Sequence, residues 1–145
     1  MPSVAQTTFT IRASAATSGT SGQDDAVTLP FAGTGPMFVL VEKTAEANAD
    51  NVLTARLQCS LDGTWYDVPF QEYWVTVAET NTTQVEPTGD PTQYAGNAID
   101  IVNESSSPAF KALYVYHHLP SSVIRTIWIA SGTTPSHTFY VKGFI

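Results

Sequence analysis

The segment "NVLTARLQCS", residues 51–60, constrains the fold most, because apolar and polar residues alternate along it without interruption. Leu53, Ala55, Leu57 and Cys59 fall on one side of an extended chain, and the polar residues between them fall on the other. A strand with one apolar and one polar face covers a core on one side only, as strands of antiparallel sheets do. The segment therefore predicts a half-buried antiparallel strand, with the only cysteine of the chain as a small core residue.

A tight turn is predicted directly after this strand, at Asp62 and Gly63. Glycine reaches positive φ without steric penalty and aspartate tolerates it, so the pair fits a two-residue hairpin loop. The run "TWYDVPF" then returns as the partner strand. Residues two positions apart in a strand share a face, so Tyr66 lies on the same face as Val68, and we expect Tyr66 in the core. Trp65 lies on the opposite face, where a subunit contact is a more frequent role than a ligand contact.

A second hairpin closes the sequence, with "SVIRTIWIA" and "HTFYVKGFI" as strands and "SGTTPS" as the loop between them. Shorter apolar runs bounded by Gly, Pro, Ser and Asn lie between the two hairpins, and none has the length and period of a helix. Charged residues make up only 13% of the chain, which suits pleated sheets more than solvated helices. We predict an all-β protein, an antiparallel β-sandwich or jelly-roll-like barrel with about eight to ten strands.

The chain has 145 residues, a length typical of one domain. Residues 1–26 are lightly patterned: residues 7–13, "TTFTIRA", are compatible with one short strand, and the Ser/Gly/Thr stretch after them lacks apolar periodicity. Together they predict an extended N-terminal arm that is flexible or ordered by a partner. Residues 27–145 are predicted to form a single β-sandwich domain. Within it, the apolar run 37–42 indicates a strand buried on both faces or nearly so. Residues 80–96 form a long polar excursion, a feature that is either functional or ordered by a partner.

The charge distribution argues against two classes of partner. The formal net charge is −7, and the basic residues are scattered singly along the chain, at Arg12, Lys43, Arg56, Lys111, Arg125 and Lys142. A phosphate-binding groove needs clustered positive charge, so we expect no direct contact with nucleic acid. An anionic membrane surface is disfavoured for the same reason, and the first residues lack the pattern of a signal peptide.

The spacing of the three histidines in the sequence does not indicate a metal site. His117 and His118 are neighbours on a predicted strand, so their side chains should leave on opposite faces and cannot bind one ion together. His137 lies twenty residues further on, without cysteines or clustered acids nearby. Zinc catalysis is therefore not expected. The acidic runs at residues 24–25, 46–51 and 87–91 leave a structural ion as a minor alternative.

Enzyme motifs are also missing from the sequence. It contains no G-x-S-x-G elbow, no G-x-G-x-x-G and no phosphate-binding loop. We therefore expect no enzyme, no catalytic residue, no metal and no cofactor. A small hydrolase would require an unexpected pocket in which one of the three histidines meets a carboxylate.

Carbohydrate binding is a further possibility, because small β-sandwiches often present exposed aromatic rings to sugars. The aromatic candidates are Trp65, Tyr66, Tyr73, Trp74, Tyr94 and Trp128. Aromatic residues also dominate cores and subunit contacts, which is the more common role.

The two hairpins together suggest a family. The segments "LQCSLDGTWYDVP" and "VIRTIWIASGTTPSHTFYVKGF" resemble a layout of small virion proteins of tailed bacteriophages, with S-x-D-G-x-W-Y in the first and R-x-x-W-x-x-x-G-T-x-P-S-x-T-F-x-V in the second. The resemblance covers about residues 37–70 and 112–145. Proteins of this kind are capsid decoration (cement) proteins or other accessory proteins of the head and tail.

This resemblance implies a bacteriophage virion structural protein, made in the host cytoplasm and located on the outer capsid surface. It would be a capsid decoration protein that binds the major capsid protein from outside, stabilises the shell and forms a homotrimer. Residues 1–26 would contact a neighbouring subunit or the capsid, and residues 80–96 would lie at an interface or at the outer tip. The alternative is a tail or baseplate accessory protein or a carbohydrate-binding β-sandwich module.

Overall fold

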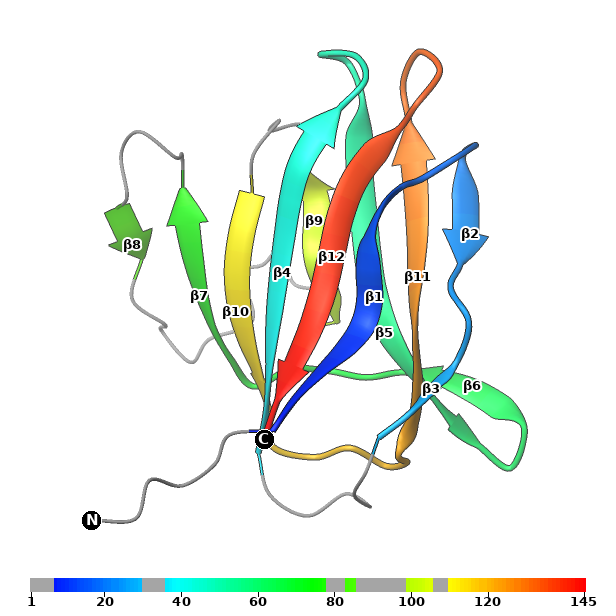
Figure 1. The fold of residues 1–145 in the computed structure, drawn as a ribbon, viewed down its shortest axis with the longest axis vertical. Helices are drawn as coiled ribbons and strands as arrows, with labels where there is room; N and C mark the ends of the chain where they lie inside the picture. The colour runs from blue at the N-terminus through cyan, green and yellow to red at the C-terminus, as the bar shows by residue number, and fades with distance from the viewer. Residues whose placement is uncertain (1–6, 30–35, 78–82, 86–98, 106–109) are drawn as a thin grey trace.

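The computed structural model describes residues 7–29, 36–77, 83–85, 99–105 and 110–145. Within these ranges the chain is all-β, with twelve strands and no helix, arranged in two antiparallel sheets that face each other as a β-sandwich (Figure 1). This confirms the predicted fold class. The strands exceed the expected eight to ten because several have only two to four residues, too few to leave a periodic pattern in the sequence. No helix in the described part of the chain is long and apolar enough to cross a membrane.

The front sheet lies toward the viewer in Figure 1 and has six strands. In spatial order they are β1 (Thr8–Ala16), β12 (His137–Phe144), β4 (Met37–Glu46), β10 (Phe110–Tyr116), β7 (Glu72–Val77) and β8 (Thr83–Val85). The C-terminal strand β12 pairs with β1 on one side and with β4 on the other. The end of the chain is therefore held inside a sheet, as strand-like sequence up to the last residue predicts.

The strand before β12, β11 (Val123–Ser131), lies in the other sheet, so the predicted second hairpin is wrong. Both strands and the turn between them are present, but turn residues do not decide whether the returning strand pairs with its predecessor or crosses to the opposite sheet.

The back sheet is built around two long strands. Its path is β2 (Ser21–Gln23), β11 (Val123–Ser131), β5 (Val52–Leu61) and β6 (Thr64–Asp67); in addition β3 (Val27–Thr28) pairs with β11, and β9 (Asp100–Ser105) pairs with β5. The apolar residues of β5 are buried and alternate with half-buried polar ones, so the prediction for this segment is confirmed. Asp62 and Gly63 connect β5 to β6 with φ of 55° and 80°, the left-handed geometry that the Asp-Gly pair predicts.

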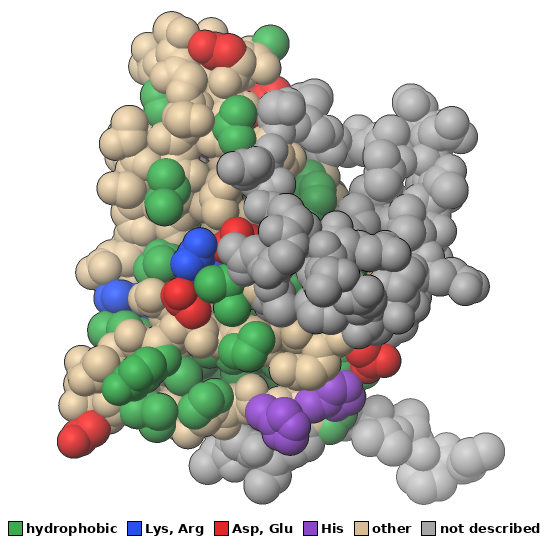
Figure 2. Space-filling view, turned by 180° about the vertical axis from the view of Figure 1, so that it is seen from behind, with side chains coloured by type: hydrophobic (Ala, Val, Ile, Leu, Met, Phe, Trp, Pro, Cys, Tyr) green, Lys and Arg blue, Asp and Glu red, His purple; other side chains and the backbone are tan. Residues whose placement is uncertain are grey.

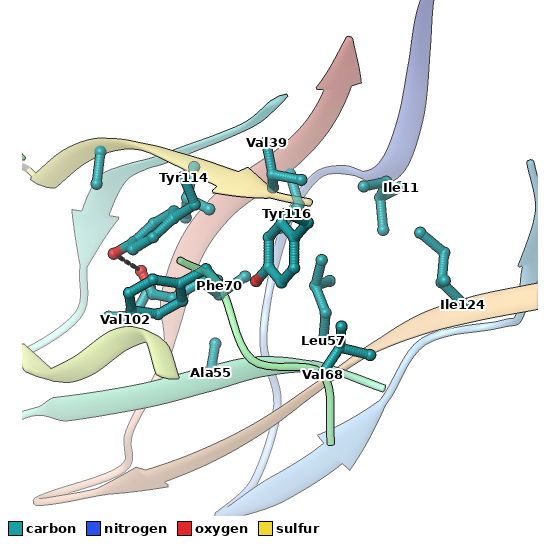
Figure 3. Packing of buried hydrophobic residues seen from close by; sticks show 14 of the residues in the cluster. Ile11, Val39, Ala55, Leu57, Val68, Phe70, Val102, Tyr114, Tyr116 and Ile124 are labelled. Carbon is teal, nitrogen blue, oxygen red and sulfur yellow. Dashed lines mark hydrogen bonds between the residues drawn. The ribbon is translucent and has the colours of Figure 1, made fainter. Parts of the chain in front are cut away.

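The core lies between the inward faces of the two sheets. Phe70 is its aromatic centre, with the ring of Tyr114 at 4.6 Å and that of Tyr116 at 6.3 Å between centroids (Figure 3). The hydroxyl of Tyr114 donates a hydrogen bond to the carbonyl of Ile101, so this buried polar group is satisfied. Rings from the front sheet thus pack against residues of the back sheet such as Leu57.

The expected N-terminal arm is part of the sandwich from residue 7 on, and the short strand predicted at residues 7–13 is confirmed as β1. Strand β1 pairs with β12 in the front sheet, and β2 pairs with β11 in the back sheet. Arg12 is buried and forms an ion pair with Asp24, which fixes β1 to the segment after β2. A Ser/Thr-rich strand can join a sheet edge through backbone hydrogen bonds alone, without apolar periodicity. Residues 1–6 lie outside the described residues, and of the excursion 80–96 only β8 is described.

Strand β4 is buried on one face only, contrary to the prediction for residues 37–42. Met37, Val39 and Val41 point inward and are fully buried. Phe38 points outward and is 36% exposed, and Leu40 is part-exposed on the same face. A run of apolar residues cannot by itself show whether a second layer covers the other side of the sheet.

Candidate functional site

The β5–β6 hairpin projects beyond the lower corner of the front sheet (Figure 1). Tyr66 pairs with Cys59 across the hairpin and therefore points to the inward face, as parity predicts. However, Tyr66 is 50% exposed and Leu61 is 41% exposed. The prediction that Tyr66 belongs to the core is wrong, because parity decides which face a side chain takes and not whether the opposite sheet extends far enough to cover it.

Trp65 lies on the outward face of the hairpin, as predicted. The guanidinium of Arg125 covers its ring at 4.1 Å from the centroid, a cation–π contact. The same guanidinium donates two hydrogen bonds to Oε1 of Gln58, at 3.0 and 2.9 Å, which hold it in place. One face of the indole is thus occupied by the protein itself, and sugar stacking on that face would require Arg125 to leave.

A charge network holds the hairpin to the rest of the back sheet. Arg56 on β5 contacts Asp67 on β6 and Asp100 on β9, each at 3.0 Å. Gln58 donates a further hydrogen bond of 2.9 Å to Asp67. The projecting hairpin is therefore a stiff extension of the sheet rather than a loose loop, since its return strand is bonded to β5 by both backbone and side chains.

Of the other aromatic candidates, the two that the structure describes do not join the hairpin rings. Tyr73 and Trp128 are buried in the core, and the ring of Trp128 lies against Gly22 of β2. The side chain of Trp74 and all of Tyr94 are outside the described residues. Among the described candidates, the exposed rings Trp65 and Tyr66 point to opposite faces of one strand, so they do not line a common sugar cleft.

The exposed histidines lie together at the lower end of the sandwich (Figure 2). Strand β10 ends at Tyr116, so His117 and His118 follow the strand instead of belonging to it, and the expectation that they leave opposite faces of a strand is wrong. Nε2 of His117 is 3.0 Å from a carboxylate oxygen of Glu72. Within the described ranges no three His, Cys, Asp or Glu side chains form a metal-binding group.

The third histidine is buried between the sheets beside two charged side chains. Nδ1 of His137 lies 4.0 Å from Oε2 of Glu46, and Nζ of Lys43 lies 3.3 Å from the same oxygen and 3.2 Å from the carbonyl of Ser105. Burial and then the charge of Lys43 lower the pKa of His137, so the imidazole is neutral at pH 7. Burial also lowers the pKa of Lys43, while Glu46 acts in the opposite direction.

A histidine therefore meets a carboxylate at two places, the geometry that a hydrolase would require. His137 is fully buried and out of reach of a substrate. His117 and Glu72 are both exposed side chains at the surface. No hydroxyl or thiol of the described residues is hydrogen-bonded to either imidazole, so the described part of the chain supplies no nucleophile at either place.

The two acidic runs that the structure describes are used for structural contacts. Asp24 neutralises Arg12. Oδ2 of Asp50 accepts hydrogen bonds from the hydroxyl of Thr133 at 2.7 Å and from its amide at 2.9 Å, and these bonds lower the pKa of Asp50. The run 87–91 is outside the described residues. The buried group of Lys43, Glu46 and His137 was missed from sequence, although charged residues within apolar strands are a signal that could have identified it.

Comparisons with protein-family models, with curated proteins and with solved structures give no match for this chain.

Proposed function

We propose that this chain is a bacteriophage virion structural protein, a capsid decoration (cement) protein that binds the outer surface of the major capsid shell and stabilises it. The observation that carries the proposal is the projecting β5–β6 hairpin, which contains the S-x-D-G-x-W-Y layout and exposes Leu61 and Tyr66. Large apolar side chains on a stiff projection are typical of a protein that works within an assembly. A protein of this kind needs complementary surfaces and no reactive group.

Shell stabilisation follows from binding. A ligand that binds the assembled shell but not the separated subunits shifts the equilibrium toward the shell in proportion to its affinity and concentration. A sandwich whose two sheets share an aromatic core supports such contacts without a large ordering cost at the interface. Residues 1–26, through the exposed part of β1, and residues 80–96 remain the proposed further contacts with neighbouring proteins.

The test is rebinding to empty shells assembled from the major capsid protein of the same virion. We expect the protein to co-sediment with the shells and to raise the temperature at which they come apart. Tyr66→Ser, which removes the exposed ring of the hairpin, should weaken binding by about tenfold. Ile129→Ser is the matched control, because Ile129 is 57% exposed on the back sheet, away from the hairpin. A wild-type protein without affinity for shells would overturn the proposal.

The alternative function is a tail or baseplate accessory protein or a carbohydrate-binding module. The exposed ring of Tyr66 is the observation in its favour, because a half-exposed aromatic ring can stack on a sugar. Binding to a glycan array that is lost in Tyr66→Ala and kept in Ile129→Ser, together with no binding to shells, would favour this alternative.

A further inference from the structure

The imidazole of His137 is enclosed at the upper end of the sandwich, where β4 ends and β12 begins (Figure 1). It is fully buried, and neither ring nitrogen makes a hydrogen bond to a described residue. Buried polar groups are nearly always paired, so an unpaired imidazole needs an explanation other than packing. An aliphatic side chain would fill this space without the cost of desolvating two ring nitrogens.

The charges beside His137 oppose its protonation. Nζ of Lys43 and Nδ1 of His137 lie near the same oxygen, Oε2 of Glu46, at 3.3 and 4.0 Å. One carboxylate thus faces two groups that can carry positive charge. Burial and then the charge of Lys43 lower the pKa of His137, while Glu46 and the backbone of Val52 act in the opposite direction. A proton on the imidazole would therefore be poorly accommodated in the closed site.

The other charged side chains toward this end are engaged elsewhere. Arg12 of β1 is paired with Asp24, and Asp50, in the turn before β5, accepts hydrogen bonds from Thr133. The side chain of Glu104 on β9 lies outside the described residues. In the described part of the chain, the charges that act on the imidazole are those of the lysine and the carboxylate on β4.

Residues 13–17, which we call the covering segment, close the sandwich beside His137. The amide of Thr17 donates a hydrogen bond of 2.8 Å to the carbonyl of His137, and the amide of His137 donates one of 3.0 Å to the hydroxyl of Thr17. The hydroxyl of Ser136 donates a third, of 3.1 Å, to the carbonyl of Thr17. Thr17 is itself buried, so the covering segment lies between this part of β12 and solvent.

The covering segment is the weaker of the two attachments of β12. It belongs to β1, the edge strand of the front sheet, and its residues 13–16 are exposed. The pairing of β1 with β12 is interrupted between Arg12 and Ala15. On the other side β12 pairs with β4, where Val39 and Val41 are fully buried. Segments with few buried apolar contacts open at lower cost than the core, which favours opening on the β1 side.

We propose that the upper end of the sandwich is a pH-sensitive switch, in which protonation of His137 makes the covering segment detach from β12 while the rest of the sandwich stays folded. The imidazolium gains hydration that the closed site denies it, and water screens its repulsion by Lys43. Opening exposes a backbone edge of β12, to which another strand can pair. The inference does not depend on the proposed function, and a chain without affinity for shells would leave it unaffected.

Hydrogen exchange resolved by residue tests the switch at pH 7.5 and 5.5, after correction for the intrinsic pH dependence of exchange. In the open state the imidazole has its ordinary pKa of 6.5, so opening should be about tenfold more favourable at pH 5.5. We expect the protection of the Thr17 amide to fall by about this factor. His137→Gln should abolish the fall, and His118→Gln, the control at an exposed histidine, should keep it.

Low concentrations of urea separate local opening from unfolding of the whole domain. Local opening exposes little surface, so protection at Thr17 should hardly change with urea, whereas protection at Leu57 in the central strand β5 should fall steeply. The same urea dependence at both amides would overturn the inference, because the covering segment would then open only with the domain. Protection at Thr17 that does not depend on pH would also overturn it.

A reversible crosslink gives a matched comparison within one protein. Ala16 and Thr138 are partners across β1 and β12, so Ala16→Cys combined with Thr138→Cys allows a disulfide between the two strands. The oxidised form should lose the acid-dependent exchange at Thr17, and the reduced form should regain it. Exchange that remains equally acid-dependent in the oxidised form, or in His137→Gln, would overturn the inference.

Discussion

The guanidinium of Arg12 lies over the ring of Phe139, 4.2 Å from its centroid, and this contact holds the N-terminal strand against the C-terminal one. Nε and Nη2 of Arg12 donate hydrogen bonds to the carbonyls of Phe139 and Ala15, and Nη1 contacts Asp24. One buried cation thus connects β1, β12 and the segment after β2. A segment with little sequence pattern is thus held by one buried side chain that makes three hydrogen bonds and a cation–π contact.

Replacing this cation should be costly. Arg12→Met keeps the apolar stem but leaves Asp24 without its partner, and we expect a loss of about 2–4 kcal/mol in the free energy of unfolding. Urea denaturation followed by tryptophan fluorescence measures it. Asp25→Asn is the control, because Asp25 is exposed and should change stability by less than about 0.5 kcal/mol. Equal effects of the two variants would show that the Arg12 contacts contribute little.

Gly132 and Gly19 both have positive φ but differ in the room that a Cβ atom would find, so their alanine variants can be compared. A Cβ on Gly132 would lie 2.5 Å from the carbonyl oxygen of Asp50, whereas one on Gly19 would meet nothing within 4 Å. Their φ angles are +109° and +79°, so both substitutions strain the backbone. Gly19→Ala should therefore cost about 1–2 kcal/mol. Gly132→Ala should cost about 1–3 kcal/mol more in thermal or urea unfolding, because the loop must also move away from residue 50.

Stability should decline in acid because of His137. Its pKa in the folded protein is below the ordinary value of 6.5, so between these two values the unfolded chain binds a proton that the folded protein does not. The free energy of unfolding is therefore expected to fall as the pH drops below about 6.5 and to level off below the pKa of the folded state.

His137→Gln should flatten this part of the stability profile between pH 7.5 and 5, whatever its effect on stability at pH 7.5. His118→Gln is the control, since His118 is exposed and outside the buried group. The neighbouring charged groups are Lys43 and Glu46 on β4, and Glu46→Gln should steepen the decline by removing the carboxylate that favours imidazolium. An unchanged profile in His137→Gln would assign the acid sensitivity to other groups.

Tyr140 should ionise late in an alkaline titration. Partial burial and the hydrogen bond that its hydroxyl donates to Glu42 raise the pKa of Tyr140 to about 12. Because the unfolded chain ionises near 10, stability should decrease as the pH rises from 10 toward 12. Ultraviolet titration of the wild type and of Tyr140→Phe measures this, and the latest tyrosine to ionise should be the one that is lost in the variant.

Local features of the fold could be predicted wherever neighbours in sequence decide the structure. The alternation before Cys59 specifies one buried face, and the Asp62-Gly63 pair specifies the turn that follows. Side-chain parity placed Trp65 on the outward face for the same reason, since successive residues of a strand point to opposite sides. Each of these features is decided by residues that lie within a few positions of one another in the sequence.

Two of the failures concern what lies on the other side of a strand. Tyr66 has the parity of a core residue and the exposure of a surface residue, because the front sheet ends before the hairpin does. Phe38 stands in an apolar run but on an uncovered face. Periodicity reports which residues share a face, and only the extent of a second sheet decides whether that face is buried.

The sequence by itself determined the all-β class, the β5–β6 hairpin and the single core face of β5, because strand alternation and turn chemistry act between neighbouring residues. Only the tertiary structure decided that β12 joins the front sheet and β11 the back sheet, that Lys43 and Glu46 share a buried site with His137, and that Leu61 and Tyr66 stand outside the core. These relationships join residues far apart in the chain, and their energies come from burial and charge pairing that exist only after the two sheets have met.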